Sequence, residues 1–173
     1  MTYELITLEY KGDFATITMN NPKRRNALSL KHMLELTSAF QEVGESNALG
    51  VILAANGPAF SAGHDFADVV DRDLVAVRKL LQVCTTLMDT IQEIPQPVLA
   101  RVHALATAAG CQLVATCDLA VASTDAGFAT RRSTAARPRA RRRARSGVTR
   151  YAAAQRDGWS FRSRHGWPET ADR

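Results

Sequence analysis

Apolar and polar positions follow regular patterns along the chain as far as about residue 130. Two stretches that alternate apolar and polar residues, 3–10 and 14–20, are joined by Lys-Gly-Asp and predict a β-hairpin. Ser29 then precedes apolar residues at helical spacing, which predicts a helix over about 30–43 with Ser29 as its cap. The predicted apolar face of this helix comprises Leu30, Met33, Leu34, Leu36, Thr37 and Phe40.

The rest of the patterned region repeats a strand followed by a helix. The fully apolar run 50–55 predicts a buried strand, and strands also end the segments 95–102 and 118–123. A short helix is predicted over 107–117 and a long one over about 74–94. The long helix is indicated by Leu74, Val77, Leu80, Leu81, Cys84, Leu87, Met88 and Ile91. This alternation predicts an α/β fold with right-handed crossovers.

The pattern stops near Thr130, and the charge changes sign there. Residues 1–130 carry 9 Lys and Arg against 14 Asp and Glu, a net charge of −5. Residues 131–173 carry 13 Arg against 3 acidic residues, a net charge of +10, and contain no Leu, Ile or Met. We therefore predict one domain over 1–130 followed by a disordered basic tail over 131–173.

Three simpler features exclude some classes of protein. Cys84, Cys111 and Cys117 have no metal-site spacing, which predicts reduced, buried thiols and no metal. No apolar run approaches the ~20 residues that cross a bilayer, so we expect no membrane association. The first residues form neither a basic nor an apolar leader, and we expect a cytoplasmic protein.

Two loops with small residues, 60–66 and 104–110, each follow a predicted strand, and the second runs into a helix. Small residues let a ligand oxygen reach the backbone, and N–H groups at the start of a helix point outward. Two such donors can stabilise an oxygen that gains negative charge. The alternative is that the small residues only allow close packing of helix on strand.

Three motifs in this order resemble the crotonase (enoyl-CoA hydratase/isomerase) family. They are NPKRRNALS (21–29), FSAGHDF (60–66) and LATAAGCQLVATCDLAVAS (105–123) with the following FAT. The match is closest to the branch called enoyl-CoA hydratase domain-containing proteins. The resemblance implies that 1–130 is the N-terminal part of a crotonase-like ββα spiral fold.

The resemblance also implies roles for particular residues. The backbone N–H groups of His64 and Ala109 would polarise the thioester carbonyl of an acyl-CoA, a substrate of fatty-acid metabolism, with no other cofactor. The remaining implied CoA and substrate contacts are phosphate contacts from Lys23, Arg24 and Arg25, an entrance lined by Ala62, Asp65 and Phe66, and the glycines Gly63 and Gly110. Without the resemblance, the three cations read as an ordinary solvated turn.

Gln112 stands where hydratases of this family carry a first catalytic Glu, and the second would fall at Arg132. A glutamine can hold water or substrate but cannot accept a proton near neutral pH. We therefore expect little or no hydratase activity. An isomerase or hydrolase that uses only the two N–H donors, a non-catalytic acyl-CoA binder and an inactive remnant all remain open.

Three further positions have structural readings. His103 and Ala104 stand where the family usually has Asn-Gly, so Ala104 is expected to strain or re-route that turn if the glycine takes a positive φ. His103 is interpreted as a hydrogen-bonded turn residue rather than a base. Asp118 is expected to bind backbone at the start of a strand, and the His64 imidazole is a minor catalytic candidate.

In relatives the segment after FAT completes the spiral and builds homotrimers or dimers of trimers, and neither part can be recognised in 131–173. The favoured hypothesis is that the reading frame is lost near Thr130. A less favoured one is that the tail binds nucleic acid through its arginines and interleaved aromatic residues.

The frame hypothesis predicts what sequencing of the gene will find. Downstream of the Thr130 codon, another reading frame should encode Pro-Gly followed by crotonase-like sequence. If neither alternative frame does so, the hypothesis is wrong.

Overall fold

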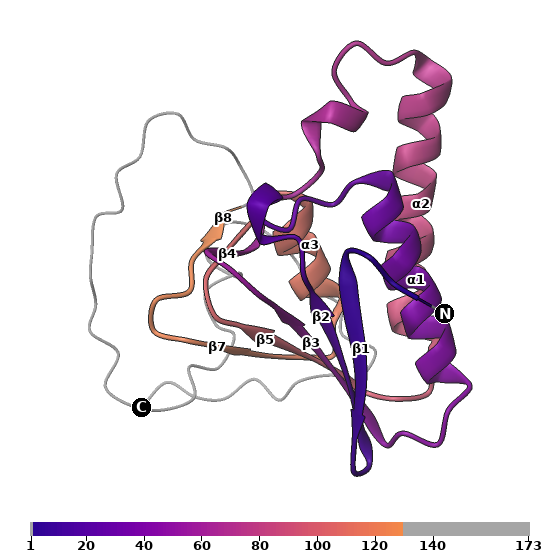
Figure 1. The fold of residues 1–173 in the computed structure, drawn as a ribbon, viewed down its shortest axis with the longest axis vertical. Helices are drawn as coiled ribbons and strands as arrows, with labels where there is room; N and C mark the ends of the chain where they lie inside the picture. The colour runs from indigo at the N-terminus through magenta and orange to yellow at the C-terminus, as the bar shows by residue number, and fades with distance from the viewer. Residues whose placement is uncertain (1, 130–173) are drawn as a thin grey trace, which may run out of the picture.

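The computed structural model describes residues 2–129, which form two β-sheets and three α-helices (Figure 1). The larger sheet contains β1 (Ile6–Lys11), β2 (Phe14–Met19), β3 (Gly50–Ala55), β5 (Val98–Val102) and β7 (Leu119–Ala122), in that spatial order. The smaller sheet contains β4 (Ala59–Ser61), β6 (Leu105–Thr107) and β8 (Phe128–Ala129). The helices are α1 (Leu30–Gly44), α2 (Leu74–Glu93) and α3 (Ala109–Thr116), with 3₁₀ turns η1 (Pro22–Arg24) and η2 (Phe66–Asp68).

The predicted hairpin is present as β1 and β2, which pair antiparallel with Ile6 opposite Met19. From β2 onward the larger sheet is parallel, and β2, β3, β5 and β7 follow one another in the sheet. Each connection between these parallel strands includes a helix, as expected for the α/β class. The predicted α/β architecture is therefore confirmed.

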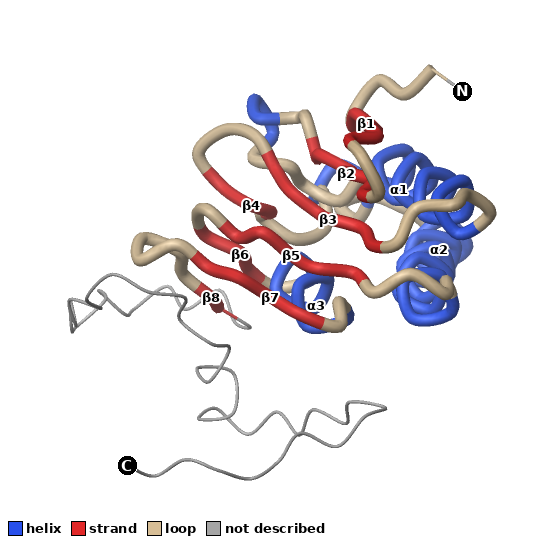
Figure 2. Tube along the Cα trace, turned by 90° about the horizontal axis from the view of Figure 1, so that it is seen from below, coloured by secondary structure: helices blue, strands red, loops and turns tan. Residues whose placement is uncertain are grey.

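The core lies between the larger sheet and the helices, which pack on one of its faces (Figure 2). Ile17, Leu53 and Ala100 stand side by side on three adjacent strands and are fully buried. Helix α1 covers them with Met33, Leu36 and Phe40, also fully buried. Thr16, Thr18, Ile52 and Leu99, which alternate with them, point to the other face and are only partly covered, as the two-residue period of a strand requires.

Helix starts follow the capping chemistry that the sequence carries. The Ser29 side chain accepts a hydrogen bond from the His32 N–H at 3.2 Å, which confirms the predicted cap of α1. Asp73 does the same for α2 by accepting from the Ala76 N–H at 2.7 Å. Both side chains satisfy an N–H that has no partner within its own helix.

Two sequence predictions were too broad or incomplete. Leu34 is 50% exposed, and Leu74 and Leu81 are 72% and 52% exposed, so the predicted apolar faces of α1 and α2 include residues outside the core. The first turns of α2 project beyond the larger sheet in Figure 1. The strands of the smaller sheet were not predicted, because two or three residues are too few to show a period.

The three cysteines are free and buried, and burial raises the pKa of each thiol. No helix within residues 2–129 is long and apolar enough to cross a membrane. The same residues contain no group of three or more His, Cys, Asp or Glu side chains that could hold a metal ion. The predicted basic tail and Arg132 lie outside the described residues.

The fold predicts a loss of stability on mild acidification. His32 is fully buried, its Nδ1 lies 3.0 Å from the Ala27 carbonyl, and its Nε2 has no described partner. Burial lowers the pKa of His32, so the folded chain resists a proton that the unfolded chain accepts below about pH 6.5. Stability should therefore fall as the pH drops through 6.5 toward 5, by at most about 1.4 kcal/mol per pH unit for this proton.

Urea unfolding between pH 5 and 8 measures this dependence. The His32→Gln variant should show a shallower slope. His64, whose pKa burial also lowers, should account for part of what remains. An unchanged slope in the His32→Gln variant would exclude His32 as the cause.

Candidate functional site

The two loops with small residues meet in the structure. Gly63 has a φ of +82°, and a Cβ built there would lie 3.0 Å from Ala108 Cβ, 3.0 Å from Thr107 O and 3.2 Å from Ala109 N. A side chain there would push the neighbouring backbone away by a few tenths of an ångström, and L-residues rarely adopt this φ. Gly63 therefore brings the first loop into contact with the start of α3.

Gly110 makes a second contact between the same loops. A Cβ at Gly110 would lie 2.6 Å from Ser61 Cβ and 2.8 Å from Ser61 O. Ser61 is the last residue of β4, which pairs in parallel with β6 just before α3. The two glycines thus allow backbone to pack on backbone at adjacent points, one in each loop.

Peptide geometry fixes the direction of two N–H groups at this contact. The described residues contain no cis peptide, so each N–H points away from the preceding carbonyl. The Gly63 carbonyl accepts from the Leu28 N–H at 2.8 Å, which turns the His64 N–H away from Leu28. The Ala108 carbonyl accepts from Cys111 N at 3.0 Å inside the helix, which turns the Ala109 N–H outward from the helix start.

Asn26 holds the first loop in place through hydrogen bonds of its buried side chain and its carbonyl. The sequence patterns did not predict this role. The Asn26 side chain is fully buried, and its Nδ2 donates to Asn56 O at 2.8 Å and to Ala59 O at 2.9 Å. Its own carbonyl accepts from Ser61 Oγ at 2.9 Å. Asn26 has a φ of +50°, which asparagine tolerates better than most residues, so this preference was the available signal.

The turn before α1 is fastened directly to the first loop. Ala62 N donates to Arg25 O at 3.0 Å, and Asp65 N donates to Leu28 O at 3.2 Å. The Asp68 carboxylate accepts from Leu30 N at 2.8 Å, which ties η2 to the start of α1. These bonds hold the loop on both sides of Gly63 and His64.

Asp65 binds Arg24 through both carboxylate oxygens. Arg24 Nη2 lies 2.6 Å from Oδ1 and 2.8 Å from Oδ2, and Nε lies 3.2 Å from Oδ2. Partial burial raises the pKa of Asp65, but hydrogen bonds from Arg24 and the Ala67 N–H and the Arg24 charge outweigh it, so the pKa lies below its usual value. Asp65 therefore stays ionised near neutral pH.

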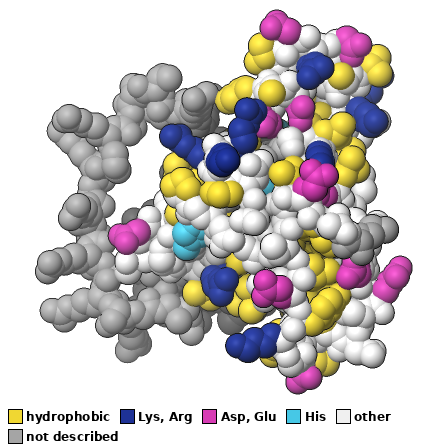
Figure 3. Space-filling model, in the orientation of Figure 1, with side chains coloured by type: hydrophobic (Ala, Val, Ile, Leu, Met, Phe, Trp, Pro, Cys, Tyr) yellow, Lys and Arg dark blue, Asp and Glu magenta, His cyan; other side chains and the backbone are white. Residues whose placement is uncertain are grey.

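The three predicted phosphate contacts are exposed. Lys23, Arg24 and Arg25 lie on and just after η1, and Figure 3 shows Lys and Arg side chains gathered over this turn. Arg24 is paired with Asp65, whereas no ion pair of Lys23 or Arg25 is recorded within the described residues. Phe66, at the start of η2, is 58% exposed.

Gln112 lies three residues after Ala109 on α3, so both face the same side of the helix. The residue is exposed, and its backbone is bonded within the helix to Ala108 and Thr116. No carboxylate replaces it at this position.

Hydrogen bonds of His103 shape the turn that contains Ala104. Ala104 does not have a positive φ; the strained residue is Ala108, with φ 50° and ψ −123°. His103 Nε2 donates to Gly57 O at 2.7 Å, and its carbonyl accepts from Ser123 Oγ at 2.8 Å, which route the turn without strain at Ala104. His103 is thus a hydrogen-bonded turn residue, as predicted.

Asp118 also has its predicted role. It accepts from the Val98 N–H at 2.8 Å, where β5 begins beside β7. The His64 imidazole is partly buried, which lowers its pKa, and the Leu28 backbone offsets this only in part. The ring is therefore neutral near pH 7, and it is the backbone of His64 that belongs to the contact between the loops.

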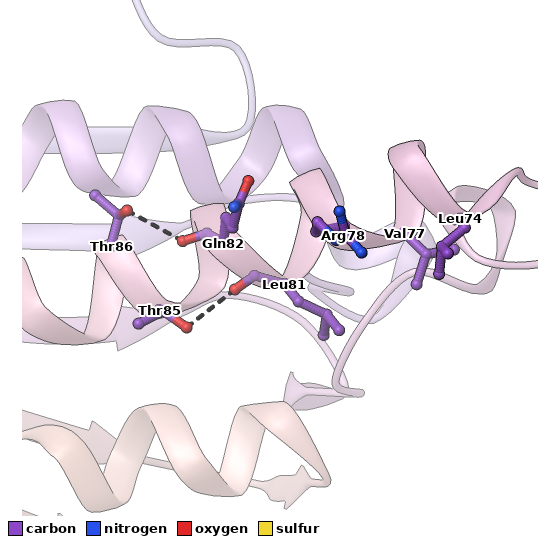
Figure 4. Close-up of a pocket in the computed structure, with 7 residues that line it drawn as sticks. All are labelled: Leu74, Val77, Arg78, Leu81, Gln82, Thr85 and Thr86. Carbon is purple, nitrogen blue, oxygen red and sulfur yellow. Dashed lines mark hydrogen bonds between the residues drawn. The ribbon is translucent and has the colours of Figure 1, made fainter.

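A hollow of about 630 Å³ runs along the exposed part of α2 (Figure 4). Its described lining comprises Leu74, Val77, Arg78, Leu81, Gln82, Thr85 and Thr86. The two threonine hydroxyls donate to backbone carbonyls of the same helix, at Leu81 and Gln82. None of the predicted site residues lines this hollow.

Comparison with known proteins places this geometry in a family. The sequence profile described as enoyl-CoA hydratase/isomerase matches residues 9–134. Enoyl-CoA hydratase domain-containing protein 3, mitochondrial, of Mus musculus is 49% identical over 130 residues, which cover 73% of this chain and 43% of the relative. The short-chain-enoyl-CoA hydratase of Clostridium acetobutylicum is 30% identical over 125 residues, which cover 71% of this chain and 48% of that one.

Solved structures of enoyl-CoA hydratases and related proteins have the same fold as this chain. An enoyl-CoA hydratase of Mycobacterium smegmatis superposes with a TM-score of 0.70 at 44% identity, covering 72% of this chain and 50% of that one. Human enoyl coenzyme A hydratase domain-containing protein 3 superposes with a TM-score of 0.72 at 39% identity, covering 73% and 51%. The chain belongs to the enoyl-CoA hydratase/isomerase family, has the crotonase fold, and spans about half the length of these relatives.

The strained residue at the start of α3 gives a stability prediction. The conformation of Ala108 costs an alanine about 1–3 kcal/mol, whereas glycine loses about 0.5–1 kcal/mol of unfolded-state entropy. Ala108→Gly should therefore raise the free energy of unfolding, by up to about 2 kcal/mol in urea denaturation. Ala76→Gly, in the exposed first turn of α2, is the control and should lower it. If both variants are destabilised, Ala108 is not strained.

Proposed function

We propose that the chain binds acyl-CoA thioesters and polarises the thioester carbonyl with the backbone N–H groups of His64 and Ala109. The observation that carries this proposal is the contact at Gly63, which brings two outward-facing N–H groups from different loops to one place. Several relatives are named enoyl-CoA hydratases, which supports the same substrate class.

Two fixed donors act on the carbonyl oxygen as it gains charge. Both N–H groups are held by backbone structure, so they need no rearrangement when a substrate arrives. The Ala109 donor has the positive end of the α3 dipole behind it. A carbonyl held in this way makes the neighbouring carbon more acidic, which is the shared first requirement of enolate chemistry.

Gln112 limits the chemistry that can follow. Its amide can orient water or a substrate group near the carbonyl, but it cannot take up a proton near neutral pH. We therefore do not propose standard hydration of an enoyl-CoA for this chain. The proposal is acyl-CoA binding with carbonyl polarisation, followed by chemistry that needs no carboxylate at Gln112, or by none.

The CoA end of the ligand is assigned to the exposed turn before α1. Lys23 and Arg25 are exposed cations beside the first loop, and Ala62 and Phe66 lie two residues before and after His64 in the chain. Coenzyme A enters as part of the substrate, and no further cofactor is needed. A cytoplasmic location stays a prediction, while the name of the mouse relative places that protein in mitochondria.

Removing one donor N–H tests the proposal directly. The probe is cinnamoyl-CoA, whose conjugated chromophore absorbs at longer wavelength when its thioester carbonyl is polarised. Ala109 is the first residue of α3, where proline fits the helix and puts a ring carbon in place of the N–H hydrogen. Proline restricts the residue before it, so the change is made together with Ala108→Gly.

The full chain and the Ala108→Gly variant should both bind cinnamoyl-CoA with a red shift. The Ala108→Gly/Ala109→Pro variant should fold but lose the red shift, and any turnover should fall by about 10²–10³-fold. A double variant that folds and keeps the full shift would exclude the Ala109 donor. A native chain that binds neither cinnamoyl-CoA nor CoA would refute the proposed function.

A further inference from the structure

The Arg24–Asp65 pair lies at the edge of the proposed carbonyl site. Asp65 is the residue after His64, and Arg24 is the last residue of η1. The guanidinium makes three contacts of 2.6 to 3.2 Å with the two carboxylate oxygens. This forked geometry fixes both the distance and the orientation of the carboxylate, which a single contact does not.

Both ends of the pair are themselves anchored. The Asp65 carboxylate also accepts from the Ala67 N–H at 3.0 Å, and the Asp65 N–H donates to the Leu28 carbonyl. On the other side, Arg24 N and Arg25 N close the 3₁₀ turn on the carbonyls of Asn21 and Pro22. The pair therefore connects a hydrogen-bonded turn to the peptide that follows the His64 donor.

Charge gives the pair a second effect. Asp65 and Asp68 place two negative side chains in and near the first loop, and Arg24 pairs with Asp65 and also feels the charge of Asp68. A negative carboxylate beside His64 opposes the charge that develops on a thioester oxygen. Arg24 both neutralises Asp65 and holds it against the turn.

Building on the acyl-CoA site proposed above, we propose that Arg24 is a positioning residue for the His64 N–H and not a ligand of the CoA phosphates. Its guanidinium is engaged by Asp65, whereas Lys23 and Arg25 on either side have no recorded ion pair among the described residues. Binding of the phosphates then falls to these two neighbours.

Two ligands separate positioning from phosphate binding. CoA carries every phosphate but no thioester carbonyl, and cinnamoyl-CoA carries both. A residue that binds phosphate contributes equally to the two affinities. A residue that positions the His64 N–H contributes only to cinnamoyl-CoA and to its red shift.

The variants are Arg24→Ala, Arg24→Lys and Asp65→Asn in the full chain. Lysine keeps the positive charge but cannot make forked contacts to both carboxylate oxygens. Lys31→Ala is the control, because it also removes an exposed cation and a recorded ion pair, the one with Glu4, away from the first loop.

We expect all three site variants to bind cinnamoyl-CoA about tenfold more weakly with a reduced red shift, a smaller effect than the ~10²-fold cost of a 1 Å misplacement. Their affinity for CoA should equal that of the native chain. Lys31→Ala should change the affinity for neither ligand. The Arg24→Ala/Asp65→Asn double variant should bind cinnamoyl-CoA no more weakly than either single variant, because each change already breaks the same ion pair.

Two results would overturn the proposal. One is equal weakening of CoA and cinnamoyl-CoA in Arg24→Ala with no loss in Asp65→Asn, which would make Arg24 a phosphate ligand. The other is an unchanged red shift in all three variants.

Amide hydrogen exchange of residues 62–68 without ligand keeps this test independent of the proposed function. Exchange should be faster in Arg24→Ala and Asp65→Asn and unchanged in Lys31→Ala. If the native chain binds neither ligand, the proposed acyl-CoA function is refuted. If amide exchange is unchanged in the Arg24→Ala and Asp65→Asn variants, the pair does not hold the loop, whatever the ligand results.

Discussion

The site depends on one close approach, between the backbone at Gly63 and the backbone at Ala108 and Ala109. A Cβ at Gly63 would stand 3.0 Å from Thr107 O, so a larger residue at Gly63 would push the two loops apart. The same contact at Gly110 and Ser61 repeats this constraint one step further along. The proposed binding of one oxygen by two peptide N–H groups depends on this close approach.

The rest of the described fold brings these two loops together. Parallel strands β3 and β5 end at the same edge of the larger sheet, and β4 and β6 continue from them as neighbours in the smaller sheet. The buried side chains of Asn26 and Ser61 donate hydrogen bonds to backbone carbonyls next to the first loop, so these polar groups have partners. The core beneath α1 and α2 therefore supports the site without supplying any of its reacting groups.

Sequence patterns predicted the long helices and the longer strands, and they singled out the loops 60–66 and 104–110 by their small residues. The cap at Ser29 and the backbone role of Asp118 follow from the place of each residue next to a predicted helix or strand. The smaller sheet could not be predicted because its strands are too short for a pattern, and the Arg24–Asp65 pair because it joins residues 41 apart in the chain. The strain at Ala108 is a backbone angle that no residue pattern reveals. The exposed apolar residues of α2 show that helical spacing alone does not tell which side is covered.

The most direct test of the shared carbonyl site is the amide chemical shifts of His64 and Ala109 in the full chain, recorded while butyryl-CoA is added. If one carbonyl oxygen accepts from both N–H groups, both amide protons move downfield and follow the same saturation curve, and CoA without an acyl group does not reproduce the change. A ligand-bound chain in which only one of these amides moves, or neither, would contradict the account.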